Sequence, residues 1–235
     1  SQSEQPLVTE LLFIRHGETD WNRQRRFQGH IDVPLNNTGL AQAERLAACM
    51  AAEPADVLIS SDLGRAWQTA APLGRAWAMQ ATPVPGLREQ SFGVLEGLDV
   101  PTIKAQHAAL WQDWLAHRGD FSLPGGGESL RQFHARVLAA VRDIARAHAG
   151  RRVAVVTHGG VLDMLWREAR GLPLDGLREC AIPNAGINRL RWRQDQLHIE
   201  VWGDDAHLAG LCKPLSTPTD ERAWVGSDSL AGKEA

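Results

Sequence analysis

Arginine and histidine stand side by side at Arg15 and His16, where the apolar run of residues 11–14 leads into a glycine. A guanidinium offers a planar fork of permanent N–H donors that matches the oxygens of a phosphate group. A neutral imidazole nitrogen can attack phosphorus and carry the phosphoryl group. Gly17 lets the backbone turn tightly beside a bound anion. The segment therefore predicts an anion site that contains its own nucleophile.

Two later segments place an arginine and a histidine in similar positions. Arg65 follows the apolar run of residues 56–60, in the expected first turn of a helix that Asp62 would cap. His158 ends another apolar run and precedes two glycines, where helix amides offer donors to an anion. Parallel strands that lead into helices bring such residues to one edge of a sheet. The residues expected to meet there are Arg15, His16, Arg65, His158 and Gly159.

Glu89 is the candidate proton donor. The leaving alcohol of a phosphate ester needs a proton, and a carboxylic acid beside an anion can supply it. Glu89 lies in the loop-like segment 87–97, where Glu96 is a rival for the same role. A surface ion pair between Glu89 and Arg88 is the ordinary alternative.

Several motifs, in order along the chain, resemble the histidine phosphatase superfamily, which includes the cofactor-dependent phosphoglycerate mutases. The resemblance runs from about residue 9 to about residue 208. The matching motifs include Arg15-His16-Gly17-Glu18, Gln28-Gly29, Ser60-Ser61-Asp62-Leu63 with Arg65-Ala66, Glu89 with Phe92-Gly93, Gly126-Gly127-Glu128-Ser129 and Thr157-His158-Gly159-Gly160.

The resemblance implies a role for each matching residue. It implies that His16 is the phosphorylated nucleophile and that Glu89 acts first as an acid and then as a base. It also assigns phosphate or substrate binding to Arg15, Asn22, Gln28, Gly29, Arg65 and His158. The amides at the start of the helix after His158 add Gly159 to this set.

The predicted function is a metal-independent phosphomonoesterase, of the histidine acid phosphatase type, that acts on small phosphorylated metabolites through a phosphohistidine. Arginines and a protonated histidine can stabilise the transferring phosphoryl group without a metal. The alternatives are a phosphoglycerate mutase and a noncatalytic phosphate-ligand binding or regulatory domain. The short segment between Glu89 and Gly126 favours water as acceptor over a retained phosphoglycerate, and a pure binder need not keep His16 and Glu89.

Motifs for other chemistries are absent from the sequence. There is no HExxH, no GxxxxGK[ST], and the three cysteines form no CxxC pair, so neither a metal, a P-loop nucleotide nor another cofactor is expected. A net charge of -3 and a pI near 6.3 argue against a nucleic-acid partner.

Membrane and secretion signals are also absent. No run approaches the roughly 20 apolar residues that a membrane helix needs, and the N-terminal segment is too polar for a signal peptide. An odd number of widely spaced cysteines is a poor disulfide framework, so a cytoplasmic protein is expected. A homodimer through an edge strand near the C-terminus stays open.

Strand-like and helix-like runs alternate along the chain, which predicts a three-layer α/β/α sandwich with a mostly parallel central sheet. The expected strands are 10–14, 56–60, 152–156, 185–193 and 196–202, and the expected helices are 38–52, 63–78, 128–148 and 160–169. Pro72 should kink or end the second helix. A catalytic domain over residues 5–210 and a flexible tail over 211–235, with a lone Trp224, complete the prediction.

Three further features each fit two roles. Trp111 and Trp114 could pack in a core or line a lid over the substrate. The basic residues Arg23, Arg25 and Arg26 could form a solvated loop or contact a second anionic group. Glu128-Ser129 fits a helix start better than a phosphate-binding glycine loop.

Overall fold

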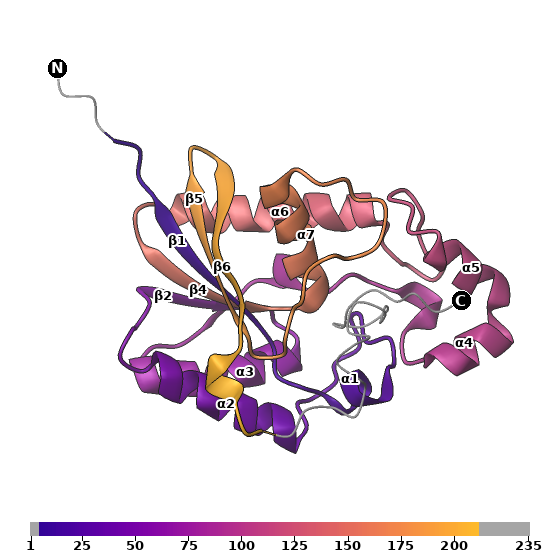
Figure 1. The fold of residues 1–235 in the computed structure, drawn as a ribbon, viewed down its shortest axis with the longest axis horizontal. Helices are drawn as coiled ribbons and strands as arrows, with labels where there is room; N and C mark the ends of the chain where they lie inside the picture. The colour runs from indigo at the N-terminus through magenta and orange to yellow at the C-terminus, as the bar shows by residue number, and fades with distance from the viewer. Residues whose placement is uncertain (1–4, 212–235) are drawn as a thin grey trace.

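The computed structural model describes residues 5–211, which form helices on both faces of one six-stranded sheet (Figure 1). The strands are β1 (Thr9–Arg15), β2 (Val57–Ser60), β3 (Thr82–Pro83), β4 (Arg152–Thr157), β5 (Ile187–Arg193) and β6 (Gln196–Asp204). The longer helices are α1 (Asp20–Gln24), α2 (Asn37–Met50), α3 (Gly64–Trp77), α4 (Val100–Gln106), α5 (Ala108–Leu115), α6 (Leu130–Ala147) and α7 (Gly159–Arg170). The tail predicted from residue 211 onward, with Trp224, lies almost wholly outside the described residues.

The sheet has the strand order β3-β2-β4-β1-β5-β6. The first four strands of that order are parallel to one another, whereas β5 pairs antiparallel with both of its neighbours, β1 and β6. The predicted fold class is therefore confirmed. The short edge strand β3 was not predicted, because a two-residue strand has no periodicity to detect.

The two faces of the sheet are covered by different helices, as Figure 1 shows. Successive side chains of a strand point to opposite faces. Leu11 and Phe13 of β1 therefore join one apolar cluster with α6 and α7, and Leu12 and Ile14 join the other with α2 and α3. Apolar side chains therefore cover both faces of the sheet. Polar side chains gather at the edge where its strands end.

The middle of the chain has its own small core, beside the sheet rather than on it. Phe27, Phe92 and Trp111 are buried in it, together with apolar residues of α4. The Trp114 ring meets Phe27 and Phe92 edge-on, with ring centroids 5.7 and 5.5 Å apart. Trp111 and Trp114 thus have the contacts of core packing, and the lid alternative gains no support.

The start of α3 differs from the prediction. The cap position is Leu63, whose side chain makes no capping bond, and the backbone N–H of Gly64 donates instead to Asp32 Oδ1 at 2.7 Å. The Asp62 carboxylate accepts two hydrogen bonds from Arg88, so its predicted capping role is wrong. Pro72 lies inside α3, which continues to Trp77 close to the predicted end at residue 78, so of the two alternatives for Pro72 the helix end is wrong.

Helix α6 begins as the sequence indicates. The Ser129 hydroxyl accepts from the backbone N–H of Gln132, and the Gln132 side chain accepts from the backbone N–H of Ser129. This capping box satisfies amides that a helix start leaves open. The helix-start interpretation of Glu128-Ser129 is confirmed.

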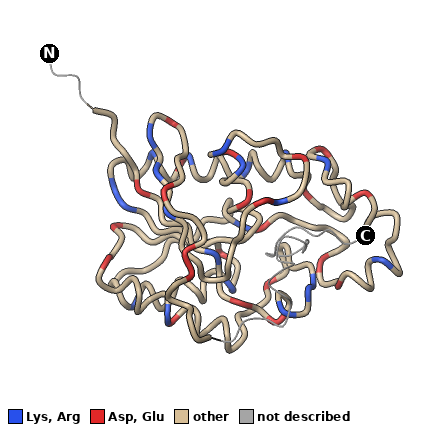
Figure 2. Tube along the Cα trace, viewed as in Figure 1, with Lys and Arg blue, Asp and Glu red and all other residues tan. Residues whose placement is uncertain are grey.

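Charged residues of both signs are interspersed along the described trace (Figure 2). Two of the basic residues in and after α1 bond to neighbouring groups. Arg23 forms an ion pair with Glu18 at 2.7 Å, and Arg26 donates to the carbonyl of Gly97 at 2.9 Å. These contacts fit a structural loop better than a second anion site.

Candidate active site

His16 and His158 each follow directly on a parallel strand. Arg15 pairs with Thr157 in the β1–β4 register, and the backbone N–H of His16 donates to the Thr157 carbonyl at 2.9 Å. Neighbouring parallel strands that end together bring the next residues together, and the two imidazole centroids are 5.2 Å apart. The structure thus joins these two histidines at the carboxyl edge of the sheet.

The His16 ring is oriented by its own turn. Nδ1 lies 2.6 Å from the Gly17 carbonyl oxygen, which can only accept a hydrogen bond. Nδ1 therefore carries a proton, and in a neutral ring the lone pair is on Nε2. The turn itself is tight: the Gly17 N–H donates to Thr69 Oγ1 at 2.9 Å, and a Cβ on Gly17 would lie 2.7 Å from the Gly39 carbonyl oxygen.

Both predicted phosphate-binding arginines are buried and bonded to backbone carbonyls. Arg65 is fully buried at the start of α3, where its guanidinium donates to the carbonyls of Ile31 and Gly29 at 2.8 and 2.7 Å. Arg15 donates to the Ile182 carbonyl at 2.5 Å. These bonds set the direction of each guanidinium and connect Gly29 to the site through its backbone.

His158 is held by a residue whose role the sequence did not indicate. Its Nε2 lies 2.8 Å from the hydroxyl oxygen of Ser61, which also accepts from the Leu63 N–H. The next residue, Asp62, has a pKa below its ordinary value, because Arg88 hydrogen-bonds it and the charges of Arg88 and His158 favour the carboxylate. Asp62 is thus an anion on the His158 side of the site.

The Glu89 carboxyl group is buried beside the start of α7. Its Oε2 accepts from the backbone N–H of Gly160 at 2.9 Å, and its Oε1 accepts from that of Gln90 at 2.8 Å. Since Glu89 is fully buried and Arg88 pairs with Asp62, the surface ion pair alternative is wrong. Gly160 follows His158 by two residues, which brings the candidate acid next to the two histidines.

Glu96, the rival acid, has a different task. Its Oε1 accepts from the backbone N–H groups of His30 and Ile31, and its Oε2 accepts from that of Phe92. These bonds join two loops. Glu89 also accepts a backbone bond at each oxygen, so the two acids differ in place: Glu89 lies against Gly160, two residues after His158, whereas Glu96 lies against the loops of His30 and Phe92.

Asn22 and Gln28 form a small polar network with Thr19. Asn22 Oδ1 accepts from the backbone N–H of Thr19 at 3.0 Å, and Gln28 Oε1 accepts from the Thr19 hydroxyl at 2.8 Å. The side-chain nitrogens of Asn22 and Gln28 are buried and have no hydrogen-bond partner among residues 5–211. Buried donors are normally bonded. These two N–H₂ groups could therefore donate to a ligand.

Asn184 was missed by the sequence reasoning. Its side-chain nitrogen donates to the His16 carbonyl at 3.1 Å and approaches Asn22 Oδ1 at 3.4 Å. It comes from the loop before β5, far from His16 in sequence. No motif marks it, so only the fold reveals it.

Metal and thiol chemistry gain no support in the part of the chain that the structure describes. Residues 5–211 contain no group of three His, Cys, Asp or Glu side chains able to hold a metal ion. Cys49 and Cys180 are free thiols, and burial raises the pKa of Cys180 to about 12. Within the same residues, every helix is too short or too polar to cross a bilayer.

Comparison with known proteins identifies the family. A family model described as the histidine phosphatase superfamily (branch 1) matches residues 11–205. The chain belongs to this superfamily. The resemblance noted in the sequence is thereby confirmed at the level of the family.

Two curated relatives from Arabidopsis thaliana cover most of the chain. Phosphoglycerate mutase-like protein 4 is 36% identical over 209 residues, which is 88% of this chain and 90% of the relative. A metal-independent phosphoserine phosphatase is 35% identical over 206 residues, 87% and 85% of the two chains. Among solved structures, Bacillus stearothermophilus YhfR superposes with a TM-score of 0.80 at 30% identity, over 85% of this chain and 99% of that one.

Proposed function

We propose that this chain is a metal-independent phosphomonoesterase that works through a phosphohistidine at His16. The observation that supports it most is the Nδ1 contact with the Gly17 carbonyl, which leaves Nε2 as the nucleophilic atom. Buried guanidinium groups of Arg15 and Arg65, with His158, would surround the phosphoryl group. Such donors act without reorganisation when they are held in place beforehand.

In the first half-reaction, His16 Nε2 would attack phosphorus and the bond from phosphorus to the ester oxygen would break. Glu89, in its carboxylic acid form, would give its proton to the departing oxygen, so that a neutral alcohol leaves. The amide nitrogens of Asn22 and Gln28 would donate to phosphate oxygens, which gives these buried groups the partners that they otherwise lack.

In the second half-reaction, the Glu89 carboxylate would take a proton from water while the water oxygen attacks phosphorus. The bond between phosphorus and Nε2 would break, and inorganic phosphate would leave. Glu89 regains the proton that it gave away, so one turnover restores the starting enzyme.

The substrate class would be small phosphorylated metabolites. One relative is named a phosphoserine phosphatase and the other phosphoglycerate mutase-like, so O-phosphoserine and 3-phosphoglycerate are the first substrates to assay. Transfer to water is favoured over transfer to a second phosphoglycerate, because the segment after Glu89 is short and folds into its own apolar core.

The test is hydrolysis of p-nitrophenyl phosphate and O-phosphoserine in the presence of a chelator. Wild type should release phosphate with both, and denaturation during turnover should trap an acid-labile phosphoenzyme. His16→Ala should lower the rate by about 10⁴-fold or more, as removal of other enzymatic nucleophiles does. Equal rates for the variant and wild type would refute the phosphohistidine route.

Two other outcomes would support a different function. Phosphate binding without turnover of any phosphomonoester would identify a noncatalytic binder. Conversion of 3-phosphoglycerate to its isomer faster than phosphate release would identify a mutase.

A further inference from the structure

The segment that carries Glu89 has little regular structure of its own. A single 3₁₀ turn, Pro85–Leu87, precedes it, and Arg88 is already in extended backbone. The backbone carbonyls of such a segment need partners from elsewhere.

Arg136, on α6, supplies most of these partners. Its Nη1 donates to the carbonyls of Gly86 and Arg88, both at 2.9 Å, and its Nη2 donates to the Glu89 carbonyl at 3.1 Å. One guanidinium therefore binds three carbonyls within four consecutive residues. His30 Nε2 adds a further bond to the Glu89 carbonyl at 2.7 Å.

Glu128 holds Arg136 from the other side. The Nε and Nη2 atoms of Arg136 donate to the two carboxylate oxygens at 2.8 and 2.7 Å, a two-point ion pair. Glu128 Oε1 also accepts from the Ser91 backbone N–H at 2.9 Å. Burial raises the pKa of Glu128, but hydrogen bonds from Arg136 and Ser91 outweigh it, and the pKa lies below its ordinary value. Glu128 is thus ionised at neutral pH.

The same helix also lies near the Glu89 carboxyl group. The Arg136 guanidinium carbon lies 5.1 Å from the centre of the Phe133 ring. Phe133 is fully buried, and a Cβ on Gly160 would lie 3.1 Å from its ring and 2.0 Å from Glu89 Oε1. Helix α6 therefore bonds the Glu89 backbone through Arg136 and brings Phe133 next to Gly160, whose N–H bonds the Glu89 carboxyl group.

We propose that Arg136 and Glu128 are positioning residues for the acid and base steps of Glu89, an inference that rests on the proposed function. The Arg136–Glu128 clamp acts on the backbone of the acid and does not touch the groups that grip phosphate. A guanidinium is required, because a lysine ammonium is a point charge without the planar fork that reaches three carbonyls and a carboxylate together.

A residue that only stabilised the fold would affect all substrates alike, whereas a positioning residue for an acid would not. p-Nitrophenolate is a stable anion and leaves without a proton. The alkoxide of serine is a strong base and needs one. Loss of the clamp should therefore act mainly on the alkyl ester.

The experiment compares kcat/KM for p-nitrophenyl phosphate and O-phosphoserine in wild type, Arg136→Lys and Glu128→Gln. A misplacement of about 1 Å can cost about 10²-fold in rate, and we expect a loss of that order for Arg136→Lys with O-phosphoserine. The loss with p-nitrophenyl phosphate should be several times smaller, and the inhibition constant of inorganic phosphate should not change. Glu89→Gln should show the same selectivity between the two esters.

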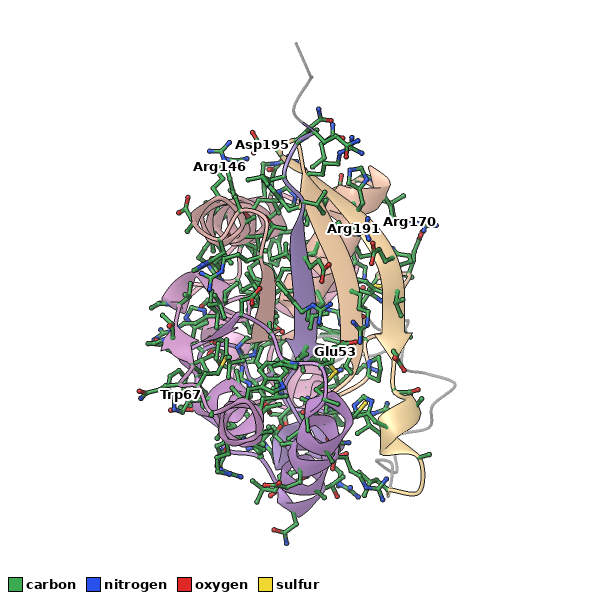
Figure 3. All side chains as sticks on the ribbon, turned by 90° about the vertical axis from the view of Figure 1, so that its left-hand side faces the viewer. Glu53, Trp67, Arg146, Arg170, Arg191 and Asp195 are labelled. Atoms are coloured by element: carbon green, nitrogen blue, oxygen red, sulfur yellow. The ribbon has the colours of Figure 1, made fainter. Side chains whose placement is uncertain are left out.

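The matched control is Arg146→Lys, at the far end of the same helix. Arg146 and Asp195 lie together at the molecular surface (Figure 3). They form an ion pair, and both side chains are more than half exposed. This variant should keep wild-type kcat/KM with both esters. Glu128→Gln, which keeps the size of the side chain and one acceptor oxygen, carries the comparison if Arg136→Lys does not fold.

Equal losses with both esters, or no loss with either, in a folded clamp variant would overturn the inference while the proposed function stands. A wild-type enzyme that hydrolyses neither ester would refute the proposed function, and the inference with it.

Discussion

The two sides of the candidate site are built in different ways. The proposed phosphate side lies at strand ends and in the first turn of a helix, and it consists of Arg15, His16, Arg65 and His158. Backbone ladder bonds of the sheet fix their Cα atoms, for example through the β1–β4 register. The acid side consists of Glu89 in a segment without strand or long helix, and side chains of other elements bond its backbone.

This difference determines how each side tolerates substitution. A sheet ladder is shared by many residues, so a single side chain contributes little to the position of its backbone. The Glu89 segment depends on a few long side chains, above all Arg136. The acid side should therefore be the more sensitive one to changes outside the reacting residues.

The largest such effect is expected for Gly160→Ala. A Cβ at this position would lie 2.0 Å from Glu89 Oε1, so the carboxyl group must move. Because the clashing group is the end of a side chain, the fold should survive with a small change in melting temperature. We expect kcat/KM for O-phosphoserine to fall by about 10²-fold. Wild-type activity in the folded variant would show that the Glu89 contact with Gly160 does not matter.

A smaller effect is expected on the phosphate side, for Ser61→Ala. The substitution removes the Ser61 hydroxyl from His158 Nε2, while β4 still holds the His158 backbone. Loss of one hydrogen bond costs about 0.5–1.5 kcal/mol, so kcat/KM should fall by roughly 2- to 12-fold.

The dependence of the Ser61→Ala loss on the substrate shows which side of the site Ser61 acts on. The loss should be equal for p-nitrophenyl phosphate and O-phosphoserine, and the inhibition constant of phosphate should rise. A loss confined to O-phosphoserine would mean that Ser61 acts through the acid instead.

The smallest effect concerns stability in acid. The pKa of Glu128 is lowered in the folded protein, so its stabilising contribution is complete above the ordinary glutamate pKa of about 4.3 and is lost as the pH falls through the lower folded value. Melting temperature measured from pH 6 to pH 3 should fall less steeply for Glu128→Gln than for wild type. Parallel curves would show that the ion pair with Arg136 adds no pH-dependent stability.

Much of the fold could be predicted because its signals are local. The buried apolar runs of β1 and β4 and the polar residues that follow them are visible in a few consecutive letters. The motif around Arg15 and His16 also carries the family resemblance. Predicted element ends agree within a few residues wherever a helix or strand is long.

The remaining features could not be predicted, because they join residues that lie far apart in sequence. The sequence predicts Asp62 as a helix cap, but its carboxylate accepts from Arg88. The N–H of Gly64 donates to Asp32 instead. Many polar side chains can satisfy an exposed amide, and sequence alone does not show which one will be near.

The amino-acid sequence by itself determined the order of strands and helices, the family and the residues that follow the strands, since these depend on periodicity and on short motifs. Only the tertiary structure decided that Ser61 meets His158, that Asn184 meets His16 and that Arg136 grips the segment of Glu89. The physical reason is that a hydrogen bond requires a separation of about 3 Å. That separation is created by the packing of whole elements, here α6 against the sheet, and leaves no pattern in the local sequence.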